Sequence, residues 1–219
     1  TRIKDKNIYN LNGKPILSYP LEAAINSKLF DKIHVSTDSE KYAEISNNMG
    51  VIVDFLRDKK LSENKSSLMD TLRSVIDEYE KRGESYDEIC MIYATAVLID
   101  SEDLIDGYKQ FNKFGGYTPT IAVSEFPAPI ERALCKTDTG TLAWHEPENR
   151  FLHSQECITA YYDAAAFIYF NVKQIYEDKQ AVLEEYVPYI LPKWKVTDIN
   201  TYDDLMVAKY LQLGRSLEN

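Results

Sequence analysis

Helix-like and strand-like segments alternate along most of this sequence, and this alternation restricts the fold more than any other feature. Segments whose apolar residues recur at helical spacing are each followed by a short apolar or β-branched run. The predicted helices cover residues 18–29, 42–49, 68–83 and 101–114, and the predicted strands cover residues 33–36, 51–53, 88–93 and 120–124. This pattern predicts a three-layer, Rossmann-like α/β protein whose mostly parallel sheet binds ligands beyond the carboxyl ends of its strands.

The alternation breaks at Glu125, where an insertion of about residues 125–163 begins. Within it, two short apolar runs flank Asp138-Thr139-Gly140, which predicts a β-hairpin. The sheet resumes with predicted strands at 166–170 and 186–191, and a capping box at residues 201–204 begins the last helix. We therefore expect residues 1–219 to form a single domain with one inserted segment.

Composition excludes several classes of protein. The net charge of -10 argues against a nucleic-acid surface, which needs a basic footprint, although a local cationic patch still suits a small anionic ligand. No apolar run is long enough to predict a transmembrane helix. The three cysteines are widely spaced and form no CxxC pair, and no signal peptide is evident, so we expect a cytoplasmic location.

A carboxylate at a strand end is the feature to seek if the small anion is a nucleotide, because Mg²⁺ bound to phosphates usually takes one or two protein carboxylates. The best candidate is Asp198, followed by Ile199 and Asn200, just before the last predicted helix. The same residues also suit a simple turn. Residue types alone do not separate a metal site from a turn here.

Three stretches, taken in order and spacing, resemble the acylneuraminate cytidylyltransferases. They are Lys6-Asn7-Ile8, Gly13-Lys14-Pro15 and Val35-Ser36-Thr37-Asp38, and residues 126–134 are most similar to the pseudaminic acid branch of that family. The resemblance runs from Arg2 to about Leu211. It implies the nucleotide-diphospho-sugar transferase fold and a Mg²⁺-assisted reaction of CTP with a nonulosonic acid, which gives a CMP-sugar and pyrophosphate.

The resemblance also implies roles for individual residues. Matched to the family's motifs, the catalytic residues are Lys6 and Asp198, the Mg²⁺ ligands are Asp198 and Asn200, the nucleotide contacts are Asn7, Arg57, Ser66, Ser67, Tyr93, Ala94 and Thr95, and the sugar contacts are Gln155, Tyr161 and Asp163. The insertion is implied to pair two subunits as a homodimer and to complete each sugar site.

The sequence departs from the family pattern at several positions. Asn200 stands where the family usually has a second Asp, and Ala165-Ala166 stands where the pseudaminic acid branch has Gly-Gln. The family also has an apolar strand and a Gly-rich loop before the segment matched by Arg2, so we expect further residues to precede Thr1. These departures leave two alternatives open: a nucleotidyltransferase for N-acetylneuraminic acid or another sugar, and a non-catalytic homologue.

Overall fold

The sheet of this protein is mixed. The computed structural model describes residues 3–62, 67–153, 155–177 and 185–218. Its main sheet contains β3 (Glu88–Ile92), β7 (Tyr161–Asn171), β4 (Thr120–Glu125) and β8 (Val187–Ile190), in that spatial order. β4 and β8 are parallel, whereas β7 is antiparallel to both β3 and β4. The α/β class is confirmed: β3, β4 and β8 run in one direction, and β7 is inserted in the reverse direction between β3 and β4.

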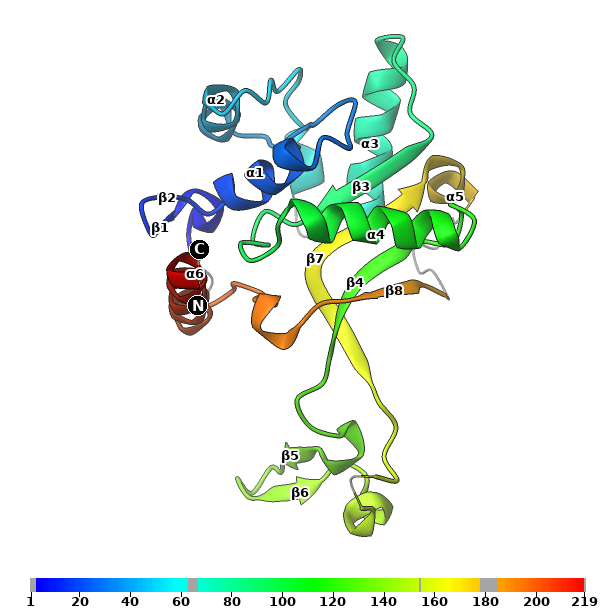
Figure 1. Cartoon of the computed structure of the whole chain (residues 1–219). Helices are drawn as coiled ribbons and strands as arrows, with labels where there is room; N and C mark the ends of the chain where they lie inside the picture. The colour runs from blue at the N-terminus through cyan, green and yellow to red at the C-terminus, as the bar shows by residue number, and fades with distance from the viewer. Residues whose placement is uncertain (1–2, 63–66, 154, 178–184, 219) are drawn as a thin grey trace.

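Helices cover both faces of this sheet (Figure 1). On one face α1 (Ser18–Ser27) packs on α4 (Ser101–Lys113), and on the other α3 (Leu68–Lys81) packs on α5 (Val172–Glu177). Strand β7 divides its side chains between the two cores, as the two-residue period of a strand requires. Phe167 and Tyr169 lie in the core under α4, while Ile168 and Phe170 lie in the core under α3 and α5.

The remaining helices lie outside the sheet and the four helices that cover it. They are α2 (Glu40–Asn48) and α6 (Tyr202–Glu218), with short 3-10 turns η1 (Lys6–Ile8), η2 (Lys59–Ser62), η3 (Ile130–Arg132), η4 (Pro147–Phe151) and η5 (Lys193–Lys195). The capping boxes at the starts of α3 and α6 are confirmed: Ser67 exchanges hydrogen bonds with Asp70, and Thr201 with Asp204. Two-residue strands β1 (Asn10–Leu11) and β2 (Lys14–Pro15) form a small separate hairpin.

Two predicted strands are wrong. Residues 33–36 and 51–53 have no strand assignment. Their apolar side chains are nevertheless placed as a buried strand would place them, since Val35 and Val51 pack in one cluster with Leu17 and Leu21. Burial was predicted only in part, since Val51 is buried, residues 33–36 are half-buried and Ile52 is exposed, and no ladder of backbone hydrogen bonds forms here among the described residues.

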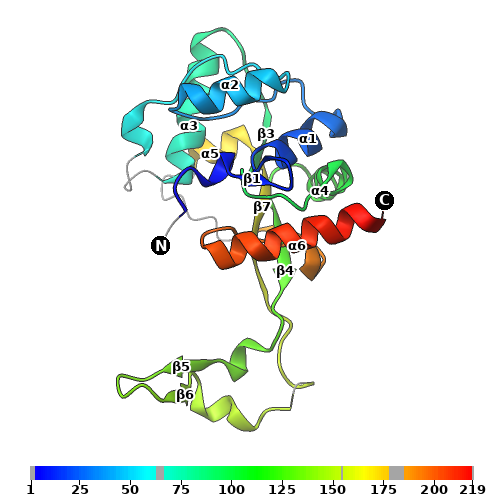
Figure 2. The same cartoon turned by 90° about the vertical axis from the view of Figure 1, so that its left-hand side faces the viewer.

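The inserted segment leaves the body of the molecule as an arm (Figures 1 and 2). Strands β4 and β7 extend beyond the sheet and carry the hairpin of β5 (Leu134–Lys136) and β6 (Leu142–Trp144), which forms where the sequence predicted it. Large apolar side chains on the arm are exposed, including Leu142, Phe151 and Ile158. The arm therefore has little core of its own.

Membrane insertion has no support in the described helices, since none of them is both long and apolar enough to cross a bilayer.

An aromatic cluster beside α3 buries a histidine. The ring of His34 stacks on Phe55 with centroids 4.5 Å apart, and its Nδ1 lies 3.0 Å from the hydroxyl of Tyr79. Tyr79 donates its own proton to Asp54 over 2.9 Å, so Nδ1 of His34 must carry the hydrogen of that ring. Nε2 is then an acceptor, buried and without a hydrogen-bond partner among the described residues. Burial lowers the pKa of His34 to about 4, against the opposing charge of Asp54.

We predict opposite effects from alanine at two helical glycines. A Cβ on Gly107 of α4 would lie 2.6 Å from the ring of Phe167, which is fully buried, whereas a Cβ on Gly214 of α6 would have open space. Overpacking should make Gly107→Ala less stable by about 1–3 kcal/mol. Gly214→Ala should gain up to about 1 kcal/mol from helix propensity. Urea unfolding measures both; a stabilising Gly107→Ala would contradict the packing of α4 on β7.

We also predict that His34 makes the protein less stable in mild acid. The unfolded chain takes up a proton near the ordinary pKa of 6.5, whereas the folded chain resists it until about pH 4. Stability should therefore fall as the pH drops through this window, by about 1–3 kcal/mol. Replacing the ring by His34→Leu should flatten this part of the profile, measured by urea unfolding at several pH values. The exposed His153 provides the control, because His153→Gln should leave the profile unchanged.

Candidate nucleotide site

Strand ends converge at one edge of the sheet. Since β7 is antiparallel to its neighbours, the carboxyl ends of β3, β4 and β8 lie at the same edge as the amino end of β7. Tyr93, which directly follows β3, donates its backbone N–H to Ala166 of β7 over 2.9 Å. This edge is where open α/β sheets bind their ligands.

A bulge in β7 shapes this edge. Ile121 of β4 faces Ile168, but Val123 faces Asp163, so β7 uses extra residues over the same length. Within the bulge Ala165 has φ of 47°, a left-handed conformation that disfavours any residue with a Cβ by roughly 1–2 kcal/mol. The N–H of Ala165 bonds to the carboxylate of Asp163 over 2.8 Å and helps to hold this turn. Glycine would suit the position better, as the family resemblance led us to expect.

A segment near the amino end of the described chain meets the segment before α6 beside this edge. The ammonium of Lys6 donates to the backbone oxygen of Ile199 over 2.7 Å and to Oδ1 of Asn200 over 3.1 Å. Nδ2 of Asn200 in turn donates to Oδ2 of Asp198 over 2.7 Å. The Asn200 amide therefore links a cation to a carboxylate, with its oxygen toward Lys6 and its nitrogen toward Asp198.

Alternating burial presents these polar groups to solvent. Thr197 and Ile199 are buried, whereas Asp198 and Asn200 are exposed, as expected for an extended segment lying against a core. The carboxylate of Asp204 accepts the N–H groups of Asn200 and Thr201, and these bonds hold the pKa of Asp204 below its ordinary value. The start of α6 thus fixes the end of the segment that carries Asp198.

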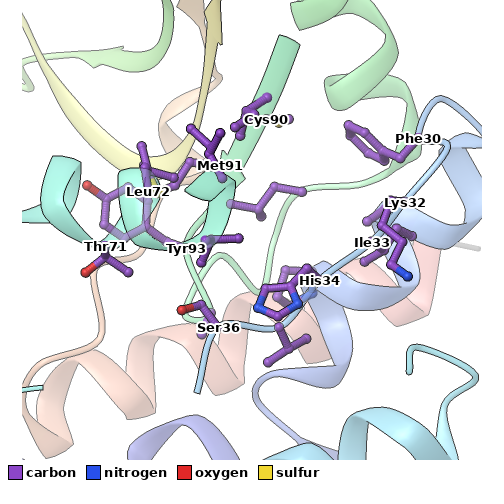
Figure 3. Close-up of a pocket in the computed structure, with 18 of the residues that line it drawn as sticks. Phe30, Lys32, Ile33, His34, Ser36, Thr71, Leu72, Cys90, Met91 and Tyr93 are labelled. Atoms are coloured by element: carbon purple, nitrogen blue, oxygen red, sulfur yellow. The ribbon is translucent and has the colours of Figure 1, made fainter. Parts of the chain in front are cut away.

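A cavity of about 420 Å³ lies between residues 32–36 and β3. Figure 3 shows its walls, to which apolar side chains of α1, α3 and β3 contribute. Arg57, Tyr93 and Ala94 also line the cavity. Burial raises the pKa of Tyr93, and the nearby carboxylates of Asp163 and Asp198 raise it further. Tyr93 therefore lies between the cavity and the two carboxylates.

The structure places the predicted site residues in two groups. Lys6, Asp198 and Asn200 form one hydrogen-bonded cluster. The carboxylates of Asp163 and Asp198 both lie close enough to Tyr93 to raise its pKa. The others are dispersed. Arg57 and Ala94 line the cavity, Thr95 is buried, and Ser67 caps α3. Asn7 has a buried Oδ1 with no hydrogen-bond partner among the described residues, while Tyr161 at the start of β7 and Gln155 on the arm are exposed. Ser66 is outside the described residues.

Two polar residues at this edge were missed by the sequence analysis. The hydroxyl of Ser36 lines the cavity, is buried and has no hydrogen-bond partner among the described residues. Ser36 stands in the Val35-Ser36-Thr37-Asp38 stretch that carries the family resemblance, but the sequence analysis gave it no role in the site. Lys195 is nearly buried between two aspartates that lie more than ninety positions earlier in the chain, and its sequence neighbourhood gives no sign of that pairing.

Solved structures of other proteins have the same fold. One is CMP:2-keto-3-deoxy-manno-octonic acid synthetase complexed with CTP, which is 11% identical over 98% of this chain and 94% of its own, with a TM-score of 0.70. Another is 4-diphosphocytidyl-2C-methyl-D-erythritol synthase from Anaerococcus prevotii, 12% identical over 94% of this chain and 93% of its own, with a TM-score of 0.59. At such low identity these structures establish the α/β fold alone.

The family follows from sequence comparison. The family model described as Cytidylyltransferase matches residues 1–215, so the chain belongs to the cytidylyltransferase family and is a nucleotidyltransferase. It is 33% identical to a pseudaminic acid cytidylyltransferase from Campylobacter jejuni, over 96% of this chain and 90% of the relative. It is also 26% identical to an N-acylneuraminate cytidylyltransferase from Escherichia coli, over 96% of this chain but only 49% of that relative.

Proposed function

We propose that this cytidylyltransferase joins CTP to a nonulosonic acid, with pseudaminic acid as the substrate. The anomeric oxygen of the sugar acid attacks the α-phosphorus, and the bond from that phosphorus to the β-phosphate oxygen breaks. Pyrophosphate leaves with the bonding electron pair, the hydroxyl proton passes to water, and the product is a CMP-sugar. The reaction needs no nucleophile from the protein, so the enzyme acts by positioning its substrates and stabilising charge.

The observation that carries this proposal is the cluster of Lys6, Asn200 and Asp198 at the carboxyl edge of the sheet. It combines a cation for phosphate with a carboxylate for a metal, and it lies beside the end of β3. The similarity to the pseudaminic acid cytidylyltransferase of C. jejuni supports the choice of substrate, since it extends over nearly the whole chain.

Different residues contact the phosphates and the nucleoside. Lys6 offers the phosphates a point charge, and its ammonium is held by the backbone oxygen of Ile199 and by Oδ1 of the exposed Asn200. Arg57 and the segment from Tyr93 to Thr95 bind the nucleoside from the side of the cavity. The buried hydroxyl of Ser36 supplies a further hydrogen-bonding group there, and satisfying it would favour binding.

The donor set near Asp198 fits Mg²⁺ bound together with a nucleotide. No group of three or more potential metal-ligating His, Cys, Asp or Glu side chains occurs in the part of the chain that the structure describes, which disfavours an all-protein metal cage. Mg²⁺ in nucleotide sites needs only one or two carboxylates and fills its shell with phosphate oxygens and water. Asp198 would hold Mg²⁺, and the metal would neutralise phosphate charge. The carbonyl of Asn200, whose Nδ2 faces Asp198 here, would join the metal only if the amide turned over.

The arm is proposed to contribute residues to the sugar site. Asp163 and Tyr161 lie at the base of the arm, where β7 enters the sheet, and Gln155 lies farther out on it. The exposed apolar residues of the arm have no covering partner among the described residues. Pairing of two copies through their arms would cover these residues and would bring Gln155 toward a sugar site. The enzyme is accordingly proposed to be a cytoplasmic homodimer.

N-acetylneuraminic acid is the second candidate substrate. The observation that favours it is the similarity to the N-acylneuraminate cytidylyltransferase of E. coli. Ala165-Ala166 also lacks the polar amide that the resemblance associates with the pseudaminic acid branch. A direct comparison of the two sugar acids decides between them.

We predict that, with Mg²⁺ present, the protein releases pyrophosphate from CTP when pseudaminic acid is added, and far less when N-acetylneuraminic acid is added. Asp198→Asn should lower this rate about a hundredfold or more, because it removes the charged metal ligand. The neighbouring exposed residue gives a matched control: Asp203→Asn should keep the rate of the unaltered protein. Release with N-acetylneuraminic acid alone would overturn the substrate assignment, and full activity of Asp198→Asn would overturn the role of Asp198.

A second prediction concerns the Mg²⁺ requirement. Asn200→Asp adds a carboxylate beside Asp198 while keeping an acceptor for Lys6, so it should lower the Mg²⁺ concentration for half-maximal rate about three- to tenfold. Asn48→Asp on α2 makes the same charge change at an exposed position elsewhere and should leave that concentration unchanged. Identical Mg²⁺ titrations for the two variants would remove Asn200 from the metal site.

A further inference from the structure

Lys195 lies at the centre of a nearly buried ion-pair network next to the candidate metal ligand. Its side chain is 12% exposed, and its Nζ lies 2.8 Å from Oδ2 of Asp100 and 2.7 Å from Oδ2 of Asp103. Asp103 is itself only 7% exposed. A buried ammonium is stable only where carboxylates compensate it, so Lys195 is confined to this one place.

The two aspartates belong to a rigid structure, the start of α4. Oδ1 of Asp100 accepts the N–H groups of Glu102 and Asp103, and Oδ2 of Asp103 accepts the N–H of Asp100. This capping box fixes both carboxylates relative to the helix axis. Lys195 is thus attached to α4, one of the helices that pack on the sheet.

Asp100 is also held from a second side. Arg215 of α6 donates to Oδ2 of Asp100 over 2.5 Å and to the backbone oxygen of Leu98 over 2.7 Å. The loop between Tyr93 and Asp100, which begins with the proposed nucleoside contacts, is therefore anchored by Lys195 and, from α6, by Arg215 and by Gln212, which donates to the backbone oxygen of Val97. Only the first of these anchors connects the loop directly to the segment that carries Asp198.

The position of Lys195 also fixes which way Asp198 points. Residues 197–200 alternate between buried and exposed, with Ile199 fully buried and Asp198 exposed. A shift of this segment by one residue would turn Asp198 into the core and Ile199 into the site. The nearest strong attachment before Asp198 is the bond of Lys195 to α4.

From this geometry we infer that Lys195 is a positioning residue, which holds Asp198 at the correct distance from the nucleoside-binding segment by tying η5 to the start of α4. This inference rests on the proposed function, since it assigns Asp198 to the metal. The ion pair of Lys195 acts on the reaction by positioning the metal ligand Asp198, and Lys195 itself does not contact the substrate. Arg215 also binds Asp100, but it does so from α6, so it is the comparison for Lys195.

The test compares Lys195→Met with Arg215→Met. Each change removes one cation from Asp100, so each should lower the melting temperature. Lys195→Met alone should raise the Mg²⁺ concentration for half-maximal pyrophosphate release, by about tenfold, as loss of an outer partner of a metal ligand does. The KM for CTP should stay within about twofold, because the nucleoside contacts remain. Lys195→Gln keeps a hydrogen-bond donor and should shift the requirement in the same direction if Lys195→Met does not fold.

Mn²⁺ binding gives a readout that is independent of the sugar acid. Electron paramagnetic resonance should show that Lys195→Met binds Mn²⁺ more weakly in the presence of CTP, while Arg215→Met binds it as the unaltered protein does. An unchanged metal affinity in Lys195→Met and Lys195→Gln, or an equal loss in Arg215→Met, would make Lys195 a stability residue only. If the unaltered protein binds Mn²⁺ with CTP but uses a different sugar acid, the inference stands and the substrate assignment falls. If it binds no Mn²⁺ with CTP, both the metal site and the inference are overturned.

Discussion

The reversed insertion of β7 between β3 and β4 is the constraint on which the rest of the structure depends. Through its eleven residues β7 pairs with both neighbours, supplies aromatic side chains to one core and aliphatic or aromatic ones to the other, and carries the arm at its amino end. Because its direction is reversed, the base of the arm lies at the same edge as the ends of the parallel strands. A site at that edge can therefore draw on both the sheet and the insertion.

Chemistry at this edge depends on contacts that are distant in sequence. Lys6 contributes its charge only because it meets Ile199 and Asn200, and Asp198 faces outward because the residues around it are attached to α4 and α6. The site is not a local motif. Its geometry is the result of packing between helices that the sheet itself positions, so small losses of packing stability around α4 and α6 also bear on the site.

Local physical chemistry made much of the fold predictable. Helix starts with a capping box, such as Ser67 with Asp70, and the hairpin around Asp138 depend on neighbours within a few residues, and they form as expected. Strand direction and pairing depend on distant partners, which explains the error at residues 33–36 and why the reversed direction of β7 was not predicted. For the site, its position before the last helix made Asp198 a candidate, but only the family resemblance assigned Asp198 and Lys6 their roles, and neither indicated the buried pairing of Lys195.

Bonds between Lys6 and residues 199–200 span 193 and 194 positions, which has a consequence for the order of events during synthesis. The amino end of the chain is made first, and most of the sheet can assemble while later residues are still being added, since domains fold as the ribosome releases them. Lys6 cannot form these bonds until the segment that carries Asp198 and Asn200 has been made. A nascent chain that has not yet reached Asn200 can already have its central strands and still lack this contact, so the candidate site is completed only after the sheet.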